Sequence, residues 1–277
     1  EGLEAVRRRP GMYIGTTGPD GLHHLVWEIF DNSRDEAMGG FADDIEVVLL
    51  PGGLVRTADN GRGIPVDIHK QTKVSALDTI MTTLHAGGKF GGEGYKVSGG
   101  LHGVGASVVN ALSTYCMVEV HRDGEAHMQE YSIGKKKGNV KKVGASKLHG
   151  TVVSFVPDTS IFTGGIEFDF DKVVAHLREQ AYLVKGLRIT VVDARQSGTK
   201  PPKPGEALFI RQGLHDYPSQ TFYFEGGLRS LIAFTNRSHK PVHKNIFYVE
   251  KEETGVTVEI ALQYVDDLSA RVLPFAN

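Results

Sequence analysis

The sequence predicts an α+β protein in which a mixed β-sheet carries its helices on one face. The main observation is that amphipathic helical segments alternate with hairpins rather than with single strands. Two of these hairpins have clear turn signals, Pro51-Gly52-Gly53 and Asp123-Gly124. The predicted helices span residues 21–40, 75–86, 104–112 and 169–185, and the predicted strands span 45–50, 54–58, 115–122, 125–132, 151–156, 188–192, 246–250 and 256–265.

Apolar spacing supports the helix predicted nearest the N-terminus. Leu22, Leu25, Val26 and Ile29 fall on one face of it, and Gly39-Gly40 provides the stop signal. The next predicted helix repeats this spacing, with inward positions at Leu77, Ile80, Met81 and Leu84.

Chain length and proline content suggest two domains. At 277 residues the chain has enough material for one large core or two smaller ones. A stretch rich in proline and glycine over 193–220 predicts a long surface excursion, to which no role is assigned. We expect a domain over 1–235 and a second, truncated domain over 236–277. The chain starts at Glu1 rather than Met, and we expect it to be part of a longer protein.

Charge and cysteine content narrow the class of protein. The 31 basic residues nearly balance the 33 acidic ones, so the net charge of −2 gives no overall preference for nucleic acid. The single cysteine, Cys116, excludes a disulfide scaffold and fits a reducing compartment. No segment has the length of a membrane span, and no signal peptide is present. We therefore expect a cytoplasmic protein without a membrane partner.

A glycine cluster, Gly-Gly-Leu-His-Gly-Val-Gly at 99–105, leads directly into the helix predicted over 104–112. Glycines let backbone N–H groups approach an anion, and the helix behind adds its positive N-terminal end. The cluster predicts a phosphate-binding loop, with a tight turn as the alternative. It differs from a P-loop and from the full dinucleotide fingerprint. The polar, glycine-rich segment 87–100 before it predicts a mobile lid.

A polar stripe follows the first predicted helix at His24, Glu28, Asn32 and Asp35. Residues at this spacing share one helix face, and such a face is often simply solvated. However, asparagine is unfavourable inside a helix, and the stripe mixes a base, an acid and an amide. Glu28 can activate a water, His24 can orient that carboxylate, and Asn32 can offer an oxygen to a hard cation.

Three further candidates are weaker when each is considered alone. In the loop 59–65, Asp59 can accept a hydrogen bond from an exocyclic amine such as that of adenine, or it can merely cap a turn. Lys89 can bring positive charge to phosphates, or it can be an ordinary solvated lysine. Gly150-Thr151 begins a predicted strand, and the Thr151 hydroxyl alone indicates only an ordinary start of a strand.

Taken in order, these motifs resemble the Bergerat-type ATP-binding fold of the GHKL ATPases. Three longer strings, at 8–15, 84–90 and 95–105, resemble the B subunits of bacterial type II DNA topoisomerases. This group contains DNA gyrase and topoisomerase IV. The resemblance covers nearly the whole chain and favours gyrase, although both enzymes share the motifs. The four GHKL motifs are Glu-x-x-Asp-Asn at 28–32, Asp-x-Gly-x-Gly at 59–63, Gly-x-x-Gly-x-Gly at 100–105 and Gly-Thr at 150–151.

The resemblance implies roles for individual residues. Glu28 matches the general base for the hydrolytic water, His24 its supporting histidine, and Asn32 the Mg²⁺ ligand. Asp59 matches the acid that recognises adenine, helped by Thr151 through a water. The other implied nucleotide contacts are Gly61, Gly63, Ile64, Lys89, Tyr95, Gly100, Leu101, His102, Gly103, Val104 and Gly105, and the implied rim of the inhibitor-binding pocket consists of Arg62, Pro65 and Arg122.

The resemblance also implies an activity with ATP and Mg²⁺ as cofactors. ATP is expected to order the lid and stabilise a homodimer of B subunits, which forms a gate that captures DNA. With the gyrase A subunit, this gate drives strand passage and negative supercoiling. The family's N-terminal arm and a later catalytic lysine are expected outside these residues. We therefore expect the chain alone to be monomeric, and either weakly active or only able to bind ATP.

Other ATPases of the same superfamily are less consistent with the sequence. A histidine-kinase catalytic domain would need a helix bundle with a phosphorylatable histidine, and it lacks the Tyr-Lys-Val-Ser-Gly-Gly string at 95–100. A chaperone or mismatch-repair ATPase is disfavoured for the same reason.

Overall fold

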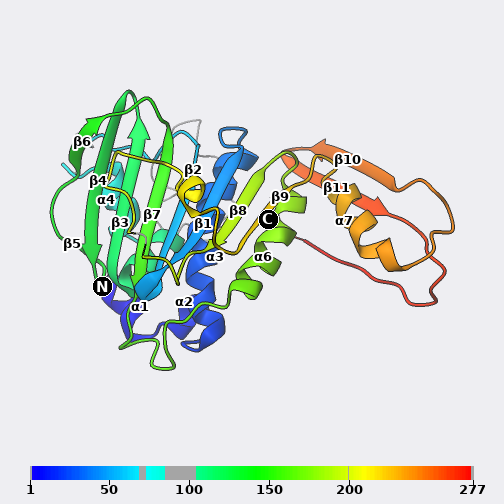
Figure 1. Cartoon of the computed structure of the whole chain (residues 1–277), viewed down its shortest axis with the longest axis horizontal. Coiled ribbons are helices and arrows are strands. Elements are labelled where there is room, and N and C mark those ends of the chain that lie inside the picture. The colour runs from blue at the N-terminus through cyan, green and yellow to red at the C-terminus, as the bar shows by residue number, and fades with distance from the viewer. Residues whose placement is uncertain (1, 69–72, 85–103, 199, 276–277) are drawn as a thin grey trace.

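The structure, a computed structural model, describes residues 2–68, 73–84, 104–198 and 200–275. Within them a nine-stranded sheet has the order β5-β4-β3-β7-β2-β1-β8-β9, with β6 paired to β4 (Figure 1). β1 pairs antiparallel with β2 and parallel with β8, so the sheet is mixed as predicted. The strands are β1 (Asp44–Leu50), β2 (Leu54–Asp59), β3 (Ser113–Arg122), β4 (Glu125–Ser132), β5 (Lys135–Lys136), β6 (Lys141–Ala145), β7 (Gly150–Pro157), β8 (Arg188–Asp193) and β9 (Ser219–Tyr223).

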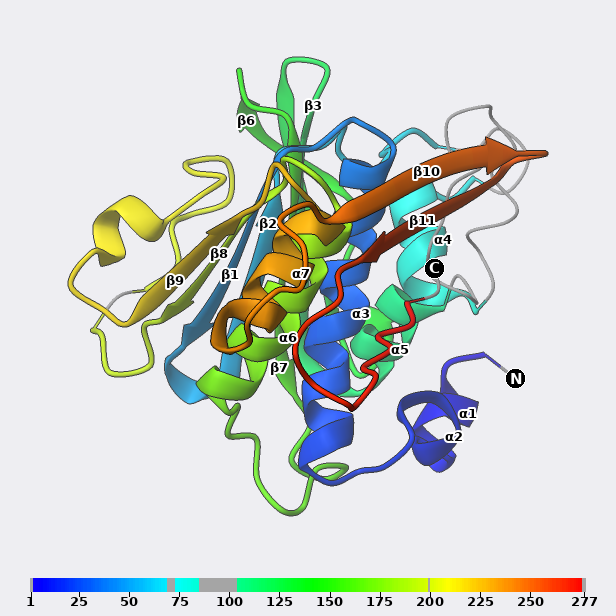
Figure 2. The same cartoon turned by 90° about the vertical axis from the view of Figure 1, so that its right-hand side faces the viewer.

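The main helices lie on one face of this sheet, as the sequence predicts (Figure 2). They pack on it through one apolar core that includes Leu25 and Ile29 of α3 and Leu177 of α6. α4 ends sooner than predicted, because Thr83 adopts extended backbone angles. The helices of this layer are α1 (Glu4–Arg8), α2 (Gly11–Ile14), α3 (Pro19–Met38), α4 (Ala76–Thr82), α5 (Gly105–Ala111) and α6 (Phe170–Leu183).

The other face of the sheet is covered by the stretch that the sequence predicts as a surface excursion. All seven residues of β1 are buried, which requires cover on both faces. Val48 and Leu50 pack with Leu214 of the excursion, and Leu208 packs with Ala58 of β2. The stretch therefore closes a second, smaller apolar layer instead of extending into solvent.

Buried charges hold this covering stretch in place. The carboxylate of Glu46 accepts hydrogen bonds from the backbone N–H groups of Ile210 (2.9 Å) and Arg211 (3.0 Å). It also faces the Arg56 guanidinium, with Nη1 3.4 Å from Oε1. Arg56 in turn donates to the Ala207 carbonyl at 2.8 Å. Burial raises the pKa of Glu46 and lowers that of Arg56, because each charge has left water.

The N-terminal segment is fastened to the far end of α5. Arg7 donates from Nη1 to the Ala111 carbonyl at 2.9 Å and from Nη2 to Asp158 at 2.7 Å. Ala111 is the last residue of α5, so the guanidinium satisfies a carbonyl group that the helix itself leaves free.

A two-stranded sheet follows the main one along the chain, in the region where a second domain is expected. β10 (Phe247–Glu253) and β11 (Val256–Leu262) form an antiparallel hairpin, and α7 (Leu228–Thr235) packs against β11. Tyr182 of α6 stacks on Phe224 with ring centroids 3.8 Å apart, which joins this region to the helical layer. No helix in the described ranges is long and apolar enough to cross a membrane.

Candidate functional site

The polar stripe on α3 brings an acid and a base together. His24 Nε2 lies 2.8 Å from Glu28 Oε1, and both side chains are partly exposed. The hydrogen bond to Glu28 raises the pKa of His24, although partial burial opposes this shift. Asn32 follows one turn later with an exposed side chain. The predicted grouping on one helix face is therefore present.

Glu28 also lies against the beginning of α5. A Cβ atom at Gly105 would come within 2.1 Å of Glu28 Oε2, so this position has no room for a side chain. Val104, the residue before α5, is partly buried. The remaining residues predicted for the phosphate loop and lid lie outside the described residues: Lys89, Tyr95, Gly100, Leu101, His102 and Gly103.

Asp59 ends β2 with its side chain buried, at 4% exposure. Its Oδ2 accepts a hydrogen bond from Ser33 Oγ at 2.8 Å, and its Oδ1 accepts one from the Gly61 N–H at 2.9 Å. Burial, together with the negative charge of Glu36, raises the pKa of Asp59 to about 6, against the lowering effect of these two hydrogen bonds and of one from the Thr151 backbone. The site thus holds a buried carboxyl group whose pKa is raised well above its usual value.

The glycines beside Asp59 allow very close approach of the backbone. A Cβ atom at Gly61 would lie 2.9 Å from both Asp59 Oδ1 and Glu36 Oε2. Gly63 has φ +77°, and a Cβ atom there would lie 2.8 Å from the His121 carbonyl oxygen. Gly63 therefore requires glycine, and a side chain at Gly61 would displace the Asp59 or Glu36 carboxylate.

Arg62 is held by Glu36, a residue that the sequence analysis missed. Its Nε and backbone N–H each donate to Glu36 Oε2 at 3.0 Å, and Nη2 donates to Oε1 at 2.7 Å. The guanidinium also lies over the Phe41 ring, 3.6 Å from its centroid. The sequence carries a signal for Glu36, because it continues the four-residue steps from Glu28 to Asn32.

The loop after Asp59 is fastened to the sheet by three donors. Arg122 Nη1 donates to the Gly63 carbonyl and His149 Nδ1 to the Gly61 carbonyl, each at 2.9 Å. The Ile64 N–H donates to Thr151 Oγ1 at 3.2 Å. The structure therefore brings together Asp59, Gly61, Gly63, Ile64, Arg122 and Thr151. Nothing in the sequence pattern indicated His149 or Ser33.

Pro65 connects this loop to the helical layer. Its carbonyl accepts a hydrogen bond from the Leu77 N–H, in the first turn of α4, at 3.0 Å. The predicted rim residues Arg62, Pro65 and Arg122 are thus all part of, or bonded to, the same loop.

The side chains at the site suit a cation that is held mainly by water and phosphate oxygens. The described residues contain no group of three or more His, Cys, Asp or Glu side chains placed to hold a metal ion. Mg²⁺ usually keeps several waters and takes one or two protein ligands together with phosphate oxygens. An exposed amide such as that of Asn32 fits this pattern.

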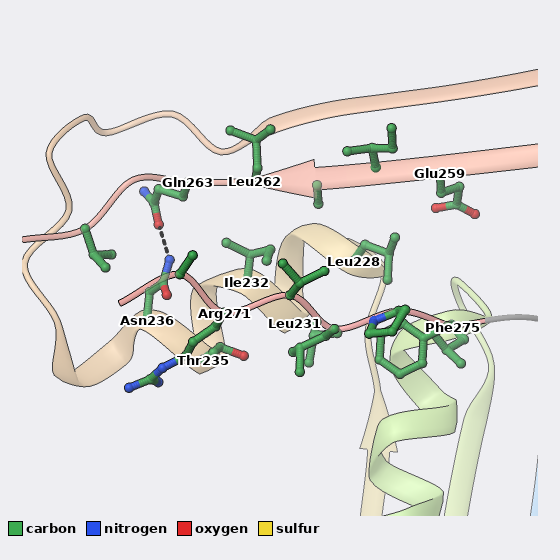
Figure 3. A pocket seen from close by; sticks show the side chains of 18 of the residues that line it. Leu228, Leu231, Ile232, Thr235, Asn236, Glu259, Leu262, Gln263, Arg271 and Phe275 are labelled. Atoms are coloured by element: carbon green, nitrogen blue, oxygen red, sulfur yellow. Dashed lines mark hydrogen bonds between the residues drawn. The ribbon is translucent and has the colours of Figure 1, made fainter. Parts of the chain in front are cut away.

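A groove of about 1340 Å³ lies apart from these residues (Figure 3). It is formed by α7, β11 and the chain from 265 to 275, with Leu231, Ile232 and Leu262 on its walls. Asn236 donates to Gln263 Oε1 at 3.1 Å beside it. Within the described part of the chain, none of the predicted site residues lines this groove.

Comparisons with known proteins agree with the fold. Residues 17–160 match the family of histidine kinase-, DNA gyrase B- and HSP90-like ATPases. This match covers just over half of the chain, so the chain belongs to that family. Along its whole length it is similar to the B subunit of DNA gyrase, with 49% identity to that of Halalkalibacterium halodurans and 46% to that of Enterococcus faecalis. The chain spans 40% of the length of each of these relatives.

A solved structure supports the same assignment. The chain resembles the crystal structure of the 43K ATPase domain of Thermus thermophilus gyrase B in complex with an aminocoumarin, with a TM-score of 0.78 and 37% identity. The match covers 95% of this chain and 62% of that one. The predicted mixed-sheet fold of the GHKL type is thereby confirmed.

Proposed function

We propose that this chain is the ATP-binding and ATP-hydrolysing part of a bacterial type II DNA topoisomerase, on the gyrase branch. The observation that carries the proposal is the buried Asp59 carboxyl group, framed by Gly61 and Gly63. A buried acceptor beside a side-chain-free surface suits a flat base with an exocyclic amine, such as adenine.

Hydrolysis is assigned to the pair on α3. Glu28 takes the proton of the attacking water, and His24 donates from Nε2 to the Glu28 carboxylate and so fixes its orientation. The general base lies beside the glycine that begins α5, so the predicted phosphate loop leads directly to it. Phosphoryl transfer depends chiefly on positioning and electrostatics, which this arrangement supplies.

Asn32 is the proposed protein ligand of Mg²⁺, with phosphate oxygens and waters as the other ligands. When bound, the ion neutralises charge on the phosphates. Lys89, Tyr95 and the backbone from Gly100 to Gly105 are proposed to cover the phosphates. Arg62, Pro65 and Arg122 are proposed as the rim of the base pocket.

The similarity to gyrase B supports a proposal for the activity of the whole protein. In this proposal ATP stabilises a homodimer of B subunits that acts as a gate for DNA in the cytoplasm. Together with a gyrase A subunit, the gate drives strand passage and negative supercoiling. We further propose that residues 1–235 form the ATPase domain, and that residues 236–277 begin the transducer domain.

Calorimetric titration with a non-hydrolysable ATP analogue, with and without Mg²⁺, tests the proposal. Binding that is strengthened by Mg²⁺ is expected for the unaltered chain. Asp59→Ala should weaken it by about tenfold or more, because a hydrogen bond to a charged group is lost. An unchanged affinity in Asp59→Ala would contradict the assignment of the base pocket.

A further inference from the structure

Ser33 has an unusual hydrogen bond for a residue in the middle of a helix. Its side chain is buried, at 4% exposure, within α3. A serine at such a position commonly bonds to the backbone carbonyl four residues earlier. Here Oγ instead donates to Oδ2 of Asp59, 26 residues further along the chain, at 2.8 Å. The bond links the helix that carries Glu28 and Asn32 to the end of β2.

This bond changes what Asp59 can offer to a ligand. With the Gly61 N–H on Oδ1 and Ser33 on Oδ2, each carboxylate oxygen already has one donor. Donors favour the ionised form, which can only accept hydrogen bonds. Burial and the negative charge of Glu36 favour the protonated form, which can donate one.

Other charged groups near Asp59 do not replace Ser33. From α3, Glu36 is engaged with Arg62, which follows Asp59 in the loop. From the segment before β7, His149 donates to the Gly61 carbonyl. Glu36 and Arg62 therefore pair with each other, and His149 contacts the backbone of the same loop. The hydroxyl of Ser33 is thus the side-chain donor that supports the ionised form of Asp59, beside the backbone N–H groups of Gly61 and Thr151.

We propose that Ser33 is a positioning residue that sets the choice of base: it keeps Asp59 as a hydrogen-bond acceptor, so that the site takes a 6-amino purine in preference to a 6-keto purine. This inference rests on the proposed ATP site. Once protonated, Asp59 would instead donate to a keto oxygen, and the preference would fall.

The test compares the affinities of ATP and ITP, whose bases carry an amino and a keto group at position 6. The unaltered chain should prefer ATP, and this preference should fall as the pH drops through the pKa of Asp59, about 6. In Ser33→Ala the preference at pH 7 should fall about tenfold, and the midpoint of its pH dependence should rise by about one pH unit. Ser33→Cys keeps a side-chain atom at the γ position but donates only weakly, and it should change the preference and the midpoint in the same direction.

Ser113→Ala is the matched control, because Ser113 is fully buried and donates to the Val109 carbonyl away from the site. It should leave the preference and the midpoint unchanged. An unchanged preference and midpoint in Ser33→Ala would overturn the inference. So would an effect in Ser33→Ala that is absent in Ser33→Cys, since packing would then be responsible.

A second measurement separates this inference from the proposed function. Carbon NMR of the labelled Asp59 carboxyl group, without nucleotide, gives its titration midpoint directly. We expect a higher midpoint in Ser33→Ala, and an unchanged one would overturn the inference even if ATP binds. Failure of the unaltered chain to bind ATP would instead contradict the proposed function.

Discussion

The Glu28 carboxylate occupies the space where a side chain at Gly105 would begin. A Cβ atom at Gly105 would lie 2.1 Å from Glu28 Oε2 and 3.2 Å from Glu28 Cβ. The last glycine of the predicted phosphate loop therefore does more than free the backbone. It leaves room for the proposed general base beside the start of α5.

Gly105→Ala should displace the Glu28 carboxylate. Because a misplacement of about 1 Å can cost roughly 10²-fold in rate, we expect turnover to fall by about that factor, with a smaller effect on ATP affinity. Phosphate release and calorimetry measure the two quantities. Gly138→Ala is the control, since no atom lies within 4 Å of a Cβ atom there. Turnover equal to that of the unaltered chain would show that Glu28 need not occupy this space.

Glu28→Gln should remove hydrolysis and leave ATP binding largely intact. The amide cannot take a proton from water, so the rate of single-turnover phosphate release should fall roughly 10²- to 10⁴-fold. Glu179→Gln, at an exposed position of α6, should have no effect. If phosphate release from Glu28→Gln is as fast as from the unaltered chain, another group is the base.

Glu46→Ala should loosen the stretch that covers the second face of the sheet. The substitution leaves Arg56 buried without its carboxylate, so the free energy of unfolding should fall by about 3–5 kcal/mol. Denaturant unfolding measures this loss, and hydrogen exchange should show faster exchange at the Ile210 and Arg211 amides. Glu252→Ala, exposed in β10, should change neither. Unchanged exchange at the two amides would contradict this account of how the stretch is held.

His176 should make the fold sensitive to mild acid. Burial, together with the nearby charges of Arg34 and His24, lowers the pKa of His176 from 6.5 to about 4. As the pH falls, the unfolded chain therefore takes up a proton on His176 at a higher pH than the folded chain does. Stability consequently falls as the pH drops from about 6.5 to about 4. Thermal unfolding should show a smaller loss over this range in His176→Phe, and an equal loss would contradict the assignment.

Trp27 provides an optical check on the same group. It is the only tryptophan of the chain, and its ring stacks on His176 with centroids 3.9 Å apart. A protonated imidazole quenches indole emission, so the fluorescence should fall with a midpoint near the pKa of about 4. The same fall in His176→Phe would assign the quenching to a different group.

Local sequence signals predicted the longer helices and most strands of the main sheet, and the polar face of α3. The hairpin at Pro51-Gly52-Gly53 and the helix over 21–40 rest on turn chemistry and 3.6-residue spacing, which neighbouring residues determine. The pairing of His24 with Glu28 follows from the same spacing. These features needed no knowledge of distant contacts.

The cover on the second face of the sheet depends on distant contacts, and the sequence analysis missed it. Proline and glycine within 193–220 favour a surface loop, yet Leu208 and Leu214 are buried. The apolar run of β1 indicated burial on both faces, but it could not identify the covering segment. Likewise, the contact of Ser33 with Asp59 spans 26 residues and follows no local pattern.

The Arg7 contacts connect the N-terminal segment to the proposed catalytic centre through α5. Arg7 donates a hydrogen bond to the last residue of α5, and the first residue of that helix lies against Glu28. A helix of seven residues is about 10 Å long. One guanidinium therefore connects the N-terminal helix, through the length of α5, to the glycine beside the proposed general base.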